Sequence, residues 1–144
     1  MDSATLGAFT DAVGALVATV PWGSWPLFDG YRSAPAAPTV AARAYRAAIL
    51  LRELRGGVHI DAVKGAGLSP AAACQFNRDR DLDNFKRHGF AEEDLVEYTP
   101  EIEAQKAAAE AATTAQMAAL FAPLSQTQLE AIVAGTNALV GALG

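Results

Sequence analysis

The sequence predicts an all-α fold, a compact helical domain of about six or seven helices over residues 1–144 with a helix-turn-helix-like centre and no clear wing. Three observations support this prediction. The composition is 51% hydrophobic and 19% charged, as in folded globular proteins. Alanine, the best helix former, dominates the apolar residues. Apolar residues recur every three or four positions in several segments, and no segment alternates as a strand does.

The first helix is expected over residues 5–19. Its apolar side chains recur at helical spacing and define one buried face, made of Leu6, Phe9, Val13, Leu16, Val17 and Val20. Residues 20–38 are expected to form a loop, because prolines and glycines interrupt every regular pattern there. We call this segment the aromatic loop, since it contains Trp22, Trp25, Phe28 and Tyr31.

Residues 39–98 are predicted to form the helix-turn-helix-like core. Thr39 is a good N-cap for a helix that runs to Arg55, and Gly56 and Gly57 are expected to end that helix. Further short helices are expected over residues 58–64 and 70–77. Asp81 is expected to cap another short helix, and residues 91–97 form one or two more turns.

Residues 99–144 are predicted to form two C-terminal helices. The first begins at Thr99-Pro100 and ends near Ala122. The second begins at a capping box made by Ser125 and Gln128. Its apolar face is expected to consist of Leu129, Ile132, Val133, Leu139, Val140 and Leu143.

Residues 60–77 contain the parts of a helix-turn-helix motif. Gly67 supplies the tight turn, Leu68 points inward, and Ser69 caps a second helix. Val63, Ala73 and Phe76 occupy positions that lock the two helices together. The same pattern also arises wherever two short helices pack around a glycine turn, so a purely structural role stays open.

A DNA-binding reading of this motif names specific residues. The second helix would enter the major groove, where Gln75 bonds an adenine edge and Arg78 a guanine edge or a phosphate. Lys64 and Arg80 would contact phosphates, as would Lys86 and Arg87. The candidates for DNA contact are therefore Lys64, Ser69, Gln75, Arg78 and Arg80.

Charge is distributed unevenly along the chain. The formal net charge is −5, yet residues 32–87 hold ten of the eleven basic residues and only five acidic ones. The flanking segments hold one basic residue and eleven acidic residues. A basic centre between acidic ends is compatible with contact to nucleic acid, which the net charge alone would disfavour.

The aromatic loop suggests a second kind of site. Its rings would clamp a small apolar ligand in a pocket lined by Trp22, Trp25, Phe28, Tyr31, Tyr45 and His59. The alternative is that the same aromatic residues anchor the loop to the core. His59 is also a hypothetical acid/base residue, and its structural alternative is a hydrogen bond to a turn.

The sequence shows no catalytic constellation, no metal-ligand spacing and no cofactor motif, so we expect no metal and no cofactor. The lone Cys74 is expected to be a buried, inert thiol. A single cysteine, the lack of a signal peptide and the lack of a long apolar run favour a cytoplasmic protein without a membrane partner.

Several stretches resemble a known family. Residues 26–35 (PLFDGYRSAP), residues 50–68 (LLRELRGGVHIDAVKGAGL) and residues 89–93 (GFAEE) resemble the C-terminal half of an actinobacterial helix-turn-helix family whose members are often labelled MarR-like. The resemblance runs from about Leu6 to the C-terminus. It implies a helix-turn-helix fold without the family's N-terminal half. It also implies the loss of a helix and wing-like turn, because Glu97 is followed almost directly by Thr99.

Taken together, these patterns predict a helix-turn-helix-like regulatory or DNA-binding-derived protein. Its first helix and last two helices are apolar enough to form a homodimer seam. Its partners would be double-stranded DNA and a second copy of the chain. The alternative is a protein on the same scaffold that binds a small apolar ligand or a partner without binding DNA. A third hypothesis is an enzyme that uses His59.

Overall fold

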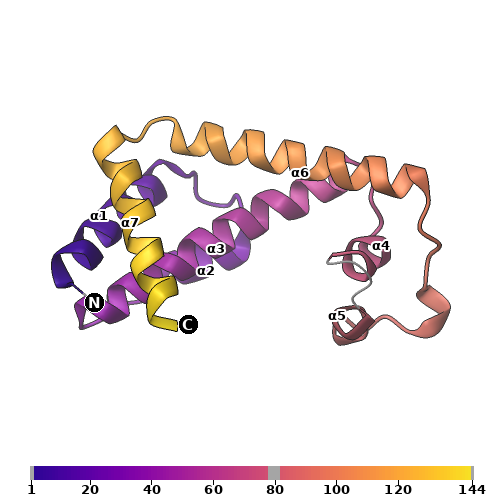
Figure 1. Ribbon diagram of the computed structural model, residues 1–144, viewed down its shortest axis with the longest axis horizontal. Coiled ribbons are helices and arrows are strands. Elements are labelled where there is room, and N and C mark those ends of the chain that lie inside the picture. The colour runs from indigo at the N-terminus through magenta and orange to yellow at the C-terminus, as the bar shows by residue number, and fades with distance from the viewer. Residues whose placement is uncertain (1, 78–81, 144) are drawn as a thin grey trace. The chain divides into compact units, whose positions relative to one another are not determined.

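Seven α-helices and one short 3₁₀ helix make up the described part of the chain (Figure 1). The computed structural model describes residues 2–77 and 82–143. Helices account for 77% of the structure and the described residues contain no strand, which confirms the predicted all-α class. The helices are α1 (Ser3–Thr19), α2 (Pro26–Ser33), α3 (Val40–Gly65), α4 (Pro70–Gln75), α5 (Leu82–Arg87), η1 (Glu92–Asp94), α6 (Pro100–Phe121) and α7 (Gln126–Leu143).

The chain divides into two compact units. The first unit comprises Met1–Gly57 and Gln116–Gly144, and the second comprises Val58–Ala115. The organisation of residues 1–144 as one domain stays a prediction. Within the described residues, none of the helices combines the length and apolar character needed to cross a membrane.

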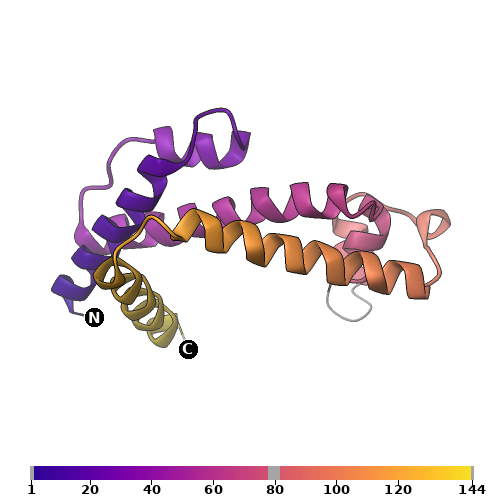
Figure 2. The ribbon, with the colours of Figure 1, turned by 90° about the horizontal axis from the view of Figure 1, so that it is seen from above.

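The core of the first unit is built on the contact between α1 and α7, which lie side by side in Figures 1 and 2. The predicted face of α1 is buried, with Phe9 and Leu16 fully enclosed. A Cβ added at Gly135 of α7 would lie on the Phe9 side chain, so glycine permits this close approach. The predicted face of α7 is partly wrong, because Val133 and Val140 are 60% and 65% exposed.

The prediction of an irregular aromatic loop over residues 20–38 is wrong at its centre, where α2 forms. Pro26 occupies the first helical turn, where its missing N–H costs nothing. Phe28 is fully buried in the core of the first unit. Arg32 pairs with Asp29 at 2.9 Å and donates to the Val20 carbonyl at 2.8 Å. These contacts hold the short helix against the chain that precedes it.

The predicted helix end at Gly56 and Gly57 is also wrong, because α3 continues unbroken to Gly65. A Cβ at Gly57 would lie 2.4 Å from the indole ring of Trp25, whereas a Cβ at Gly56 would meet nothing within 4 Å. Gly57 therefore makes room for Trp25 and does not end the helix. Helical glycine costs only about 1 kcal/mol relative to alanine, which packing can offset.

The two C-terminal helices are confirmed. Ser125 and Gln128 form the predicted capping box, in which each side chain accepts a hydrogen bond from the other residue's backbone N–H. The short helices α4 and α5 and the turn η1 also lie within the predicted core segments. Asp81, predicted to cap α5, lies outside the described residues.

Candidate functional site

The turn between α3 and α4 is built as a helix-turn-helix requires. Gly67 has φ +73°, and its N–H donates to the Lys64 carbonyl at 3.0 Å. The next N–H, that of Leu68, donates to the Val63 carbonyl at 3.2 Å. This pair of bonds is the Schellman arrangement, which satisfies the last carbonyls of a helix and needs a left-handed residue, usually glycine. Ser69 then caps α4 by accepting from the Ala72 N–H at 3.1 Å.

A small apolar core lies beneath this turn in the second unit. Leu68, Ala72 and Phe76 are buried, and partly buried side chains pack against them, namely Val63, Ala73, Val96 and Ile102. The predicted inward positions of Leu68 and Phe76 are thereby confirmed. Asn84 of α5 donates to the Cys74 carbonyl at 3.4 Å and links α4 to α5.

The prediction that Gln75 faces outward is wrong. Its side chain is only 2% exposed. Its amide nitrogen donates to the Val96 carbonyl at 2.9 Å, and its amide oxygen accepts from the Val96 N–H at 3.0 Å. Both ends of the amide are thus used inside the protein. Ala72, on the same helix, is buried as well.

The residues predicted to contact DNA differ in their exposure, and two of them are not described by the structure. Lys64 in the last turn of α3 is exposed, as are Lys86 and Arg87 in the last turn of α5. Ser69 is exposed, but its hydroxyl caps α4. Arg78 and Arg80 lie outside the described residues.

The basic centre of the sequence does not belong to one unit. Its five arginines before Gly56 all lie in the first unit. The second unit carries six basic and eleven acidic residues, a formal net charge of −5. Within it, residues 64–87 hold five basic and three acidic residues, whereas residues 92–110 hold seven acidic and one basic residue. Positive charge in this unit is therefore concentrated around α4 and α5.

Two arginines of the first unit are occupied by structural bonds. Arg46 donates to the carbonyls of Tyr31, Arg32 and Pro35 at 2.7–3.0 Å. Arg32 is held by Asp29 and Val20. These arginines connect the segment after α2 to the rest of the unit, so the sequence pattern overstated the charge available to DNA.

The six residues predicted to line an aromatic pocket have different environments. Phe28 is a core residue, and Trp25 packs on Gly57 and contacts Phe28 edge-on. Trp22 is 68% exposed and stacks on the Arg32 guanidinium at 3.4 Å. Tyr31 and Tyr45 are exposed. Trp25 and Phe28 therefore anchor this segment to the core, which was the alternative to a ligand pocket.

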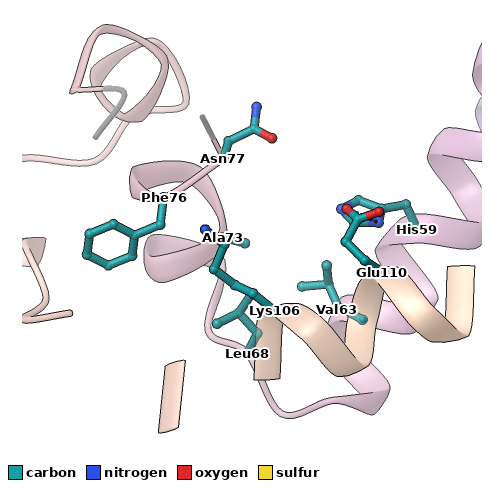
Figure 3. A pocket seen from close by; sticks show the side chains of 9 residues that line it. His59, Val63, Leu68, Ala73, Phe76, Asn77, Lys106 and Glu110 are labelled. Atoms are coloured by element: carbon teal, nitrogen blue, oxygen red, sulfur yellow. Dashed lines mark ion pairs between the residues drawn. The ribbon is translucent and has the colours of Figure 1, made fainter. Parts of the chain in front are cut away.

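His59 lines a separate cavity in the second unit, and Figure 3 shows its imidazole beside the Glu110 carboxylate. Nδ1 of His59 lies 3.0 Å from Oγ1 of Thr113 and 3.7 Å from Oε1 of Glu110. The Thr113 hydroxyl donates to the Ala109 carbonyl at 2.7 Å, so its oxygen accepts from Nδ1–H of His59. In the neutral ring this leaves Nε2 as the acceptor.

The His59 cavity measures about 50 Å³ and also includes Lys106 and Asn77. That volume holds about one or two water molecules. Sequence reasoning missed Thr113 and Glu110, because they lie more than fifty positions from His59 and no local spacing relates them. An enzymatic role for His59 stays a prediction.

The Cys74 thiol is poorly suited to nucleophilic chemistry. Burial raises the pKa of the Cys74 thiol, which keeps it protonated near neutral pH and therefore a poor nucleophile. Over residues 2–77 and 82–143, no group of three or more histidine, cysteine, aspartate or glutamate side chains is placed to hold a metal ion.

Comparison with known protein families gives a match. The model of a family described as "Helix-turn-helix family" matches residues 1–93, which is well over half of the chain. This match covers α1 to α5 and the Gly67 turn. No curated protein and no solved structure matches the chain significantly.

Proposed function

Because this chain belongs to the Helix-turn-helix family, we propose that it is a regulatory protein that contacts double-stranded DNA through phosphates and not through base edges. One observation carries the proposal. Exposed basic side chains stand at the ends of the helices around the Gly67 turn, while the polar side chain predicted to read bases, Gln75, is turned inward.

Phosphate contact is what the exposed groups can supply. Lys64, Lys86 and Arg87 carry full positive charges on long side chains, which suit the negative backbone of DNA. Base readout needs polar side chains directed from a helix into the groove. The described α4 offers none, because Gln75 is clamped to Val96 and its other residues are proline, alanine and cysteine. Binding would therefore depend little on DNA sequence.

The test reverses one charge at a time. Arg87→Glu should weaken binding of the full chain to a fluorescent duplex by roughly three- to tenfold at low salt, because it replaces an attraction to phosphate with a repulsion. Arg43→Glu is the matched control, since Arg43 is an exposed arginine of the first unit whose hydrogen bonds, to the carbonyls of Ala37 and Pro38, are long at 3.4 Å. Fluorescence anisotropy measures both dissociation constants, and circular dichroism checks that both variants stay folded. Equal losses in the two variants would contradict a specific role for α5.

The net charge of −5 in the second unit favours a second candidate function. In this alternative the helix-turn-helix is a retained scaffold for binding a small molecule or a protein, without contact to DNA. Failure of the unmodified chain to bind DNA even at low salt would overturn the first proposal in favour of this one.

The proposal includes a homodimer. Val133 and Val140 are seven residues apart on α7, so they share one face of that helix and both are exposed. Light scattering coupled to gel filtration should give twice the mass of the chain, and Val133→Glu with Val140→Glu should return it to the monomer mass. A monomer in the unmodified protein would contradict the prediction.

A further inference from the structure

A cavity in the first unit has no role in the proposal above. It measures about 180 Å³ and is lined by residues of α1, α2 and α3 and of the segment that joins α2 to α3. Val13 and Val17 of α1 and Leu50 of α3 supply its apolar wall. A dry cavity of about 150 Å³ is enough to bind benzene, so this one has room for an apolar group of about six carbons.

Positive charge surrounds this apolar space. Arg32, Arg43 and Arg46 all line the cavity, and no acidic residue does. The charge of Arg32 is compensated by Asp29, its partner at 2.9 Å. Arg46 instead donates to neutral backbone carbonyls, and Arg43 makes only two contacts of 3.4 Å, to the carbonyls of Ala37 and Pro38. Two positive charges thus line the cavity with no carboxylate bonded to either among the described residues.

Two of these arginines also have N–H groups without a hydrogen-bond partner among the described residues. The Nε atoms of Arg32 and Arg46 are buried, and neither has a hydrogen-bond partner within the described ranges. A buried donor without a partner costs roughly 1–3 kcal/mol, so such atoms commonly mark a place that a ligand or a water satisfies. Arginine beside an apolar wall is suited to a carboxylate, which accepts from two N–H groups of the fork.

We propose that this cavity binds a small monocarboxylate with an apolar body of about six carbons. The apolar body would lie against Val13, Val17 and Leu50, and the carboxylate would accept hydrogen bonds from Arg43 and Arg46. The site lies wholly in the first unit, so it is independent of the proposed contact with DNA. The sequence pattern did not predict this site, because residues from three helices form it only in the folded unit.

The binding test uses the full chain and hexanoate as the probe, followed by isothermal titration calorimetry. Hexanoate should bind saturably, and hexanamide, which has a similar shape without the charge, should bind at least tenfold more weakly. Arg43→Gln should weaken hexanoate binding at least fivefold, because it removes one of the two charges proposed to bind the carboxylate. The fold should stay intact, because this exposed side chain makes long contacts of 3.4 Å. Equal binding of hexanoate and hexanamide would overturn the proposal.

A second pair of variants tests the location. Gly14 lines the cavity and a Cβ there meets nothing within 4 Å, so Gly14→Leu should fill the space and abolish binding. Gly7→Leu is the matched control in the same helix, because Gly7 is equally unobstructed and does not line the cavity. Thermal denaturation verifies that both variants fold. Absence of saturable binding in the unmodified protein, or undiminished binding in Gly14→Leu, would overturn the proposal.

Discussion

The side chain of Gln75 shows how one residue decides what a helix can contact. Its amide bonds both backbone groups of Val96, because it donates to the Val96 carbonyl and accepts from the Val96 N–H. This arrangement ties the segment before α6 to α4. The sequence predicted Gln75 to face outward from helical spacing alone. Helical spacing cannot reveal a partner twenty-one positions away, so it could not place this side chain.

Replacing this residue should therefore affect stability and not recognition. Gln75→Leu leaves the N–H and carbonyl of Val96 without their partners, and we expect it to lower the free energy of unfolding by about 1–3 kcal/mol. Gln105→Leu is the control, because Gln105 makes one exposed hydrogen bond of 3.3 Å to Gly67, and its loss should cost less than about 0.5 kcal/mol.

Urea denaturation followed by circular dichroism measures both differences. Unchanged stability in Gln75→Leu, together with an altered preference among DNA sequences, would mean that Gln75 reads bases after all. That outcome would contradict the role assigned to the Val96 contact.

Among the helices, the long amphipathic elements were predictable and the exceptions have physical causes. The helices α1 and α7 repeat their apolar positions over several turns, and the alanine-rich α6 has a clear start at Thr99-Pro100. The helix α2 was missed because Pro26 and Gly30 resemble loop residues, yet proline is tolerated in a first turn. The predicted helix end at Gly56 and Gly57 was wrong because the glycine at position 57 makes room for the Trp25 ring. This is a tertiary contact, which the local sequence does not show.

The adjacent glycines of α3 allow a matched test of that explanation. Gly57→Ala places a Cβ against the Trp25 ring and should destabilise the protein by about 1–3 kcal/mol through overpacking. Gly56→Ala meets open space and should stabilise it by up to about 1 kcal/mol, because alanine favours helix.

Thermal denaturation of the two variants under identical conditions gives the comparison. Equal stabilisation by both substitutions would show that Trp25 does not need the space at Gly57. Equal destabilisation would instead restore the prediction that a helix end lies here.

For the whole molecule, the distribution of charge matters more than its sum. The sequence located a basic centre correctly by residue number, but half of its ten basic residues belong to the first unit. There Arg32 and Arg46 hold the segment around α2 in place. The helix-turn-helix itself has a local excess of positive charge over residues 64–87, inside a unit that is acidic overall. Such a protein should bind DNA weakly and with a marked dependence on salt.

The most direct test of phosphate contact without base readout is the affinity of the full chain for two duplexes of unrelated sequence, measured by fluorescence anisotropy from about 50 to about 200 mM salt. Three phosphate contacts, from Lys64, Lys86 and Arg87, predict a log–log slope of about −2.7. Five contacts, from all five basic residues of the segment 64–87, predict a slope of about −4.5. The dissociation constants for the two duplexes should agree within about twofold at each salt concentration. A tenfold preference for one duplex, or no binding at the lowest salt, would contradict the account.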